Sequence, residues 1–276
     1  MALRVLLPSE FQDAHRRAVL AWVRRGHEFS AEEWQVVLEA FDLLREAAIV
    51  TQRGMLPFPV VYFLHVEEPH AKRFIQALLD AEDIEPTGVR AWAEVARSML
   101  PALHEAGLAD PRHQASRLLV AYCLYWWYAF AHGYIFEVAV LRDLERCGIE
   151  FAGHDLLVRQ ERLSAWDLEV LGFRGDIKRS LFFLQTVRGR HLPHAFYIVR
   201  LRQTGRSRTL VVMMRQPMWE TIDGETLLTT LDDLANVLPD TARIRVGGAE
   251  IVVADYALWK CLVRKRQSDR PEANHV

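Results

Sequence analysis

The sequence WDLEVLGFRGDIK, residues 166–178, predicts two short strands joined by a turn that contains glycine. Side chains along a strand alternate in direction, so Asp167 and Glu169 share one face of the first strand. By the same rule, Asp176 and Lys178 share one face of the second strand. We therefore expect a β-hairpin that carries acidic side chains and one lysine.

The length of the turn decides whether the two polar faces coincide. With a two- or four-residue turn we expect Leu171 to pair with Asp176, which points both polar sets the same way. A three-residue turn would place them on opposite sides and would rule out a shared site. Gly172 and Gly175 permit a tight turn without fixing its length.

The sequence around the hairpin, after Gly148, has short β-branched and aromatic runs separated by Gly, Pro and Arg-rich turns. These runs predict strands at residues 149–151, 166–171, 176–184, 195–201 and 209–215. The remaining elements expected in this half are a helix at 224–237, a hairpin at 242–254 and a basic terminal helix at 256–267.

The first half has the 3.6-residue periodicity of helices. Helices are predicted at residues 11–25, from 31 onward, 69–80, 87–106, 110–131 and 134–147. Ser30 and Glu33 match a capping box, and Asp110-Pro111 matches a helix start. Gly133 is expected to separate the last two helices, and Gly148 to cap the second.

Two features of the first half leave alternatives open. Residues 60–64 could form a short strand or a buried loop. A domain boundary fits near residue 110 or 133, and no flexible linker marks it. We place it after residue 132, giving a helical domain at 1–132 and a second domain at 133–276, because the site described next needs the helix at 134–147.

The hairpin resembles the signature of the PD-(D/E)XK nuclease superfamily, which has the restriction-endonuclease-like fold. In that family an Asp on one strand and an acidic-x-Lys sequence on the next surround one or two divalent metal ions, often with a Glu from the preceding helix. Asp167 matches the first Asp, Asp176-Ile177-Lys178 the acidic-x-Lys sequence, and Glu137 the helical Glu. The resemblance covers about residues 133–215.

The resemblance implies an α+β or α/β chain, in which an all-helical region precedes a mixed β-sheet flanked by helices. Two positions depart from the family pattern. Trp166 stands in place of the proline of the family name, and Asp176 stands where Glu is more frequent, which shortens one metal ligand. The motif is short, so the order of helix, strand, turn and strand carries much of the resemblance.

The function implied is a Mg²⁺- or Mn²⁺-dependent endonuclease that hydrolyses phosphodiester bonds in DNA, and we expect the N-terminal helical domain to bind the substrate or a partner. Asp167, Asp176 and Glu137 are the expected metal ligands and, with Lys178, the expected catalytic residues; Glu169 is a secondary candidate. Carboxylates hold Mg²⁺ while several waters remain on the ion, which can activate one of them. Lys178 would polarise that water or stabilise charge on the phosphate.

Arginines near the hairpin are candidates for binding the nucleic-acid backbone. They are Arg179, Arg188, Arg190, Arg202 and Arg206. A solvated charged turn explains them at least as well. His191-x-x-His194 is not expected to bind a metal, because it surrounds Pro193 and lacks a third ligand nearby.

The composition is that of a globular protein of 276 residues with a net charge of −2. Residues 1–150 carry −6 and residues 151–276 carry +4, which is weak support for a polyanionic partner. Three distant cysteines indicate neither a disulfide framework nor a zinc site. With no signal peptide in the sequence, we expect a cytoplasmic protein. The apolar run 118–131 is short for a membrane span and predicts a buried helix, so no membrane partner is expected.

Two other functions remain open. The chain could keep the nuclease fold without activity and act as a nucleic-acid- or protein-binding module, with or without forming a homodimer. Asp167-x-Glu169 is also an acidic pair of the kind found in nucleotidyltransferases. The Gly-Ser that precedes such pairs is missing here, and Lys178 would have no role in that chemistry. A salt-bridged hairpin without catalysis is the simplest structural alternative.

Overall fold

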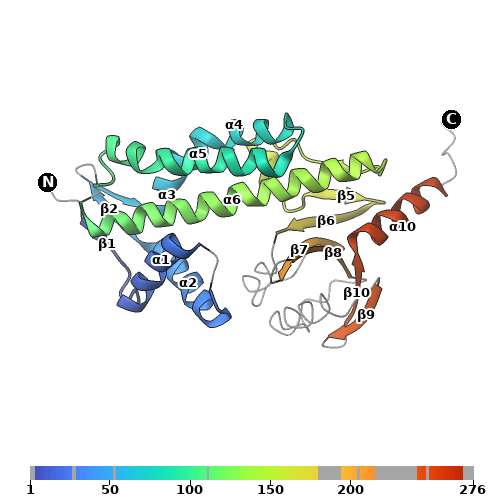
Figure 1. The fold of residues 1–276 in the computed structure, drawn as a ribbon, viewed down its shortest axis with the longest axis horizontal. Coiled ribbons are helices and arrows are strands. Elements are labelled where there is room, and N and C mark those ends of the chain that lie inside the picture. The colour runs from blue at the N-terminus through green and yellow to red at the C-terminus, as the bar shows by residue number, and fades with distance from the viewer. Residues whose placement is uncertain are drawn as a thin grey trace. The chain divides into compact units, whose positions relative to one another are not determined.

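The computed structural model describes residues 4–26, 29–51, 54–110, 112–179, 194–203, 206–214, 241–246 and 249–269. The chain divides into two compact units, Met1–His132 and Gly133–Val276, at the position where we drew the boundary from the sequence. Figure 1 labels their elements. The helix expected at 224–237 lies outside the described residues.

Helices make up most of the described first unit. They are α1 (Asp13–Arg25), α2 (Ala31–Leu43), α3 (Phe58–Tyr62), α4 (Glu68–Leu79), α5 (Ile84–Glu105) and the first part of α6 (Gln114–Arg146), with a 3-10 turn at Leu44–Glu46 and a π-helical turn at Phe63–Glu67. The predicted capping box is confirmed. Ser30 Oγ accepts a hydrogen bond from Glu33 N at 3.2 Å, and the Glu33 carboxylate accepts one from Ser30 N at 2.9 Å.

The expectation of an all-helical first region was wrong. The antiparallel strands β1 (Arg4–Leu6), β2 (Ala48–Thr51) and β3 (Gly54–Pro57) form a small sheet in that order. Strands of three or four residues contain too few alternations to show a period of two. Residues 60–64, for which we considered a strand or a loop, lie in α3 and the π-helical turn, where Val61 and Tyr62 are buried.

Helix α6 is continuous from Gln114 to Arg146, although we expected a break at Gly133. A glycine inside a helix costs about 1 kcal/mol relative to alanine, which tertiary packing readily outweighs. Ala131 and Ile135, two residues to either side, are both buried. The prediction of two helices was therefore wrong, although Gly133 does lie at the boundary between the units.

The two ends of α6 differ in how well they were predicted. The helix begins at Gln114 and not after Asp110, whose carboxylate accepts a hydrogen bond from Arg112 N at 2.9 Å in the preceding turn. At the other end, Gly148 has φ 65° and Ile149 N donates to Leu144 O at 3.0 Å. This is the predicted left-handed helix cap.

Seven described strands of the second unit form one mixed sheet, in the order β4-β5-β6-β7-β8-β10-β9. Their bounds are β4 Ala152–Gly153, β5 Leu168–Val170, β6 Phe173–Lys178, β7 Phe196–Gln203, β8 Arg206–Met214, β9 Thr241–Val246 and β10 Ala249–Asp255. Strands β6 and β7 pair in parallel, and the other neighbours are antiparallel. The mixed α+β architecture is thus confirmed, and β9 and β10 form the hairpin predicted at 242–254.

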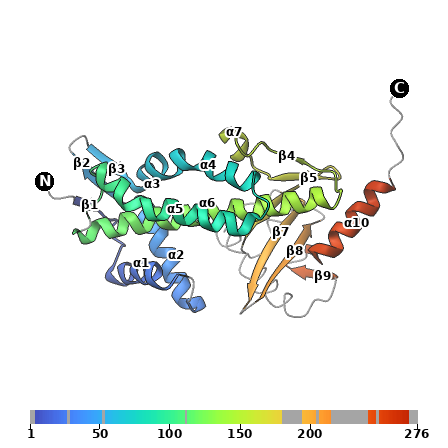
Figure 2. The same ribbon diagram turned by 45° about the horizontal axis from the view of Figure 1, so that its top comes forward.

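Two helices pack on this sheet (Figure 2). The C-terminal part of α6 and the helix α10 (Tyr256–Ser268) share one hydrophobic core with the strands; a short helix, α7 (Arg159–Arg162), lies outside it. The core residues are Phe136, Val140 and Leu144 from α6, Trp259 and Val263 from α10, and Leu168, Val170, Ile177, Phe196, Ile198, Val211 and Ala254 from the strands. Because Leu168 and Val170 of β5 enter the core, Glu169 between them faces away from it.

The apolar run 118–131 forms part of α6, and Leu118, Leu119, Cys123 and Trp127 are fully or almost fully buried there. The predicted buried helix is confirmed. Within the described part of the chain, no helix combines the length and the apolar character needed to cross a membrane.

Candidate functional site

The β5–β6 hairpin turns through two residues, Leu171 and Gly172. Val170 pairs with Phe173 and Leu168 with Gly175. Leu171 has φ 57° and Gly172 has φ 86°, the two positive values that a tight type I′ hairpin turn requires. The even turn length is as predicted, but Leu171 does not pair with Asp176, because the turn comes earlier than residues 172–175.

This register brings Asp167 and Asp176 opposite each other at the open end of the hairpin. Asp167 N donates to Gly175 O at 3.0 Å, and the Asp167 Oδ2 accepts a hydrogen bond from Ile177 N at 2.7 Å. Asp176 lies close enough to raise the pKa of the Asp167 carboxyl group. The hairpin therefore joins two acidic side chains that lie nine residues apart in the sequence.

Lys178 lies next to this acidic pair. Its Nζ donates a hydrogen bond of 2.6 Å to Asp176 Oδ1. The Asp176 side chain is 11% exposed and the Lys178 side chain 35% exposed, so the carboxylate is buried while the amine reaches solvent. A charged hydrogen bond of this length is among the stronger polar contacts in proteins.

The pKa of Asp167 reflects its surroundings. Burial raises it most, and the neighbouring Asp176 raises it further, whereas Lys178 and the Ile177 amide lower it; the result is a pKa of about 7. Ionising both of two adjacent carboxyl groups is unfavourable where they are poorly solvated. A proton or another cation is therefore needed between them near neutral pH.

Glu137 reaches the same cluster from α6. Burial raises its pKa to about 8, the charge of Asp167 contributes in the same direction, and the ammonium of Lys178 opposes both. The structure thus brings together all four residues that the resemblance selected: Glu137, Asp167, Asp176 and Lys178. Glu137 lies thirty residues before Asp167 in the sequence, whereas the other three residues belong to one hairpin.

Glu169, the secondary candidate, is not part of this cluster. Its carboxylate accepts a hydrogen bond from Arg174 Nε at 3.4 Å across the hairpin. Arg174 in turn lies over the ring of Trp166, with 5.2 Å from the guanidinium carbon to the ring centroid. Glu169 therefore forms the ordinary cross-strand ion pair that we considered for the whole hairpin.

His194 is a site neighbour that the sequence did not reveal. It is 6% exposed, and its Nε2 lies 3.9 Å from Asp176 Oδ2. Burial lowers the pKa of His194, and the charge of Lys178 adds to this effect, so the imidazole is neutral near pH 7. We considered this histidine only together with His191, which lies outside the described residues. The parallel pairing of β6 with β7 brings it to Asp176, and no local pattern encodes that pairing.

Gly175 positions the acidic strand against its neighbour. It pairs with Phe196 of β7, and a Cβ atom at Gly175 would overlap the ring of Phe196. Only glycine lets the ring lie directly over the strand at the residue before Asp176. This contact fixes β6 on β7 and so fixes the position of the carboxylate.

The arginines expected to bind nucleic acid are only partly described. Arg179 follows β6 and is partly buried, whereas Arg188 and Arg190 lie outside the described residues. Arg202 lies near the end of β7 and Arg206 lies at the start of β8, but their side chains are not described. Of their neighbours, Arg208 pairs with Asp255 at 3.2 Å.

The carboxylates supply the oxygen donors that Mg²⁺ and Mn²⁺ accept. Magnesium in proteins is usually held by one or two carboxylates together with waters and substrate phosphates. Asp167 and Asp176 fit that requirement as a pair, whereas Glu137, the third expected ligand, lies near Asp167 without completing a group of three. In the residues that the structure describes, no group of three or more His, Cys, Asp or Glu side chains has the spacing of a metal site.

Comparison with protein-family models, curated proteins and solved structures finds no match for this chain.

Proposed function

We propose that the unit Gly133–Val276 has a restriction-endonuclease-like fold and is a Mg²⁺- or Mn²⁺-dependent nuclease that hydrolyses DNA. The observation that carries the proposal is the proximity of the Asp167 and Asp176 carboxyl groups, with the Lys178 ammonium 2.6 Å from Asp176. Bringing two carboxylates together in a partly buried place is unfavourable unless a cation is part of the working site.

Each residue has a role that follows from its position. Asp167 and Asp176, with Glu137, would hold the metal ion, which when bound supplies charge neutralisation and an activated water. Lys178 is the exposed member of the cluster and is placed to contact a phosphate oxygen or the attacking water. His194 would help to hold the Asp176 carboxylate in place from its buried side. Arg179, Arg202 and Arg206 are proposed to contact the backbone of the nucleic acid.

A second candidate is a nuclease-fold protein that binds nucleic acid or another protein without cleaving. One observation favours it: in this structure Asp176 is satisfied by Lys178 and Asp167 by the Ile177 amide, so both carboxylates have partners without a metal. Nucleotidyl transfer is disfavoured, because Glu169 pairs with Arg174 and does not join Asp167.

The test is cleavage of plasmid and single-stranded DNA in the presence of Mg²⁺ or Mn²⁺. We expect the wild type to cleave, and Asp176→Ala and Lys178→Ala to lose at least about 100-fold in rate, the magnitude typical of losing a group that stabilises charge in the transition state. Asp176→Asn repeats the test with the shape of the side chain preserved.

Glu169→Gln is the matched control, because it removes a carboxylate from the same hairpin but outside the cluster. It should cleave at nearly the rate of the wild type. Equal cleavage by all variants would indicate a contaminating nuclease, and DNA binding without cleavage would favour the second candidate.

A further inference from the structure

A groove in the first unit is lined by three segments that lie far apart in the sequence. Its volume is about 270 Å³. The lining residues are Leu20, Val23 and Arg24 of α1, Leu100 of α5, Asp110 of the following turn, and Ser116, Arg117, Val120, Ala121 and Leu124 of α6. Val23 is 47% exposed, so part of the apolar wall is open to solvent.

The two arginines of the groove are not committed to other contacts. Among the described residues, neither Arg24 nor Arg117 has an ion-pair partner, whereas the adjacent Arg25 pairs with Glu33 at 3.0 Å. Residues 1–132 contain 13 Lys and Arg against 17 Asp and Glu, a net charge of −4. The groove therefore places two guanidinium groups beside an apolar wall in an acidic unit.

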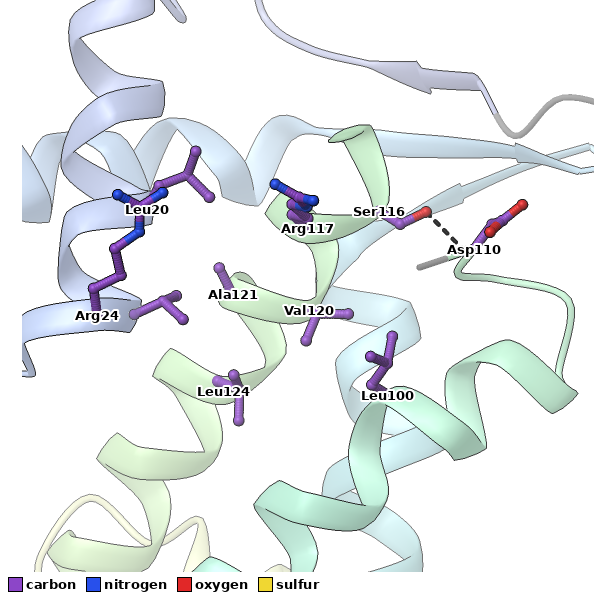
Figure 3. Close-up of a pocket in the computed structure, with 10 residues that line it drawn as sticks. Leu20, Arg24, Leu100, Asp110, Ser116, Arg117, Val120, Ala121 and Leu124 are labelled. Atoms are coloured by element: carbon purple, nitrogen blue, oxygen red, sulfur yellow. Dashed lines mark hydrogen bonds between the residues drawn. The ribbon is translucent and has the colours of Figure 1, made fainter. Parts of the chain in front are cut away.

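Figure 3 shows how the lining side chains of the groove lie. Leu20 and Arg24 of α1 lie at one side, Ser116 and Asp110 lie at the opposite side, and Arg117, Ala121, Val120 and Leu124 of α6 lie between them. Ser116 is buried and its Oγ accepts a hydrogen bond from Asp110 N at 2.9 Å, so it is satisfied within the chain. The guanidinium groups of Arg24 and Arg117 are hydrogen-bond donors of the groove that have no ion-pair partner among the described residues.

We propose that this groove binds a small amphipathic carboxylate, with the anionic group between Arg24 and Arg117 and the apolar body against Val120, Leu100 and Leu124. Guanidinium groups bind carboxylates through charged hydrogen bonds, and the leucines offer an apolar surface to the remainder of the ligand. The volume is just below the range of about 300–1,000 Å³ found for drug-sized ligands. A compact ligand fits this volume.

The test uses the full chain and calorimetric titration with octanoate, and with 1-octanol as the uncharged equivalent. We expect octanoate to bind with a Kd below about 1 mM and 1-octanol to bind at least about tenfold more weakly. Arg24→Gln and Arg117→Gln should each weaken octanoate binding about tenfold and leave 1-octanol binding unchanged. Val120→Trp, which fills the groove, should weaken both.

Arg25→Gln is the matched control, since it removes a cation from the same last turn of α1 but outside the groove. It should bind both compounds as the wild type does. The proposal is overturned if octanoate does not bind, if 1-octanol binds equally well, or if the Arg24 and Arg117 variants retain full affinity. Binding of phosphatidylglycerol vesicles through Arg117 without binding of octanoate would also overturn it, in favour of a membrane surface.

Discussion

Lys178 Nζ donates a hydrogen bond of 2.6 Å to Oδ1 of Asp176, two residues earlier on the same face of β6. The ammonium therefore contacts a carboxylate oxygen that we propose as a metal ligand. Lysine and a divalent cation compete for that oxygen. Removing the Lys178 ammonium should therefore affect DNA cleavage and metal binding differently.

Lys178→Met should abolish DNA cleavage yet bind Mg²⁺ at least as tightly as the wild type, because the competing charge is gone while the carboxylates remain. The increase in melting temperature with added Mg²⁺ measures the binding, and plasmid cleavage measures the activity. Arg174→Met, which removes a cation from the same face of the hairpin, is the control and should change neither. Weaker Mg²⁺ binding by Lys178→Met would contradict the competition.

The acidic cluster makes stability depend on pH in a defined direction. The folded-state pKa values of Asp167 and Glu137 are raised to about 7 and about 8, mainly by burial. Protonated carboxyl groups are thus favoured in the folded protein, so their contribution is complete below about pH 4 and is lost as pH rises through 7 and 8. We expect the free energy of unfolding in EDTA to fall by an amount on the order of 5 kcal/mol over this range.

The measurement is urea unfolding of wild type and Asp167→Asn between pH 4 and pH 8. The stability of the wild type relative to this variant should fall with rising pH, because asparagine does not titrate and its Oδ1 can still accept from Ile177 N. Glu137→Gln should behave in the same way. A difference that stays constant across the range would show that folding does not raise the pKa values of the cluster.

Gly175→Ala should destabilise the second unit by about 1–3 kcal/mol, because the added methyl group overlaps the Phe196 ring. Urea unfolding measures the loss. Combining Gly175→Ala with Phe196→Leu should cost less than the sum of the two single changes, since the smaller side chain at 196 leaves room for the methyl group. Additive losses would mean that the ring does not define this position.

Leu171 adopts φ 57°, which costs a residue with a Cβ about 1–2 kcal/mol. Leu171→Asn and Leu171→Ala remove the same apolar contact with the core edge, but only asparagine is well tolerated at this φ. The asparagine variant should therefore be more stable than the alanine variant by about 0.5–1 kcal/mol, measured by thermal unfolding. Equal stability would indicate that the turn relaxes in both variants.

The sequence predicted which side chains of the hairpin share a face, because the alternation of side chains along a strand depends only on neighbouring residues. The alternation of Leu168 and Val170 with Asp167 and Glu169 is visible in the sequence and holds in the structure. The place of the turn was not predictable in the same way. Leu171 is a poor residue for positive φ, so local preference favoured the glycines at 172 and 175 as the ends of a longer turn.

Contacts between distant segments were the least accessible from sequence. His194 lies beside Asp176 only because β7 pairs in parallel with β6, and the pairing of β1 with β2 joins residues more than forty positions apart. The continuity of α6 through Gly133 is also a tertiary effect, in which buried neighbours outweigh the low helix propensity of glycine. Local pattern thus predicted the candidate ligands but not the neighbours that support them.

The overlap between a side chain at 175 and the ring at 196 constrains how this chain can change in evolution. A descendant that keeps an aromatic ring at 196 is restricted to glycine at 175, whereas one with a smaller residue at 196 is free to accept alanine or serine there. The two positions should therefore vary together among relatives. A Gly-Asp-x-Lys sequence followed about twenty residues later by an aromatic strand residue is a more selective search pattern than the acidic residues and lysine alone.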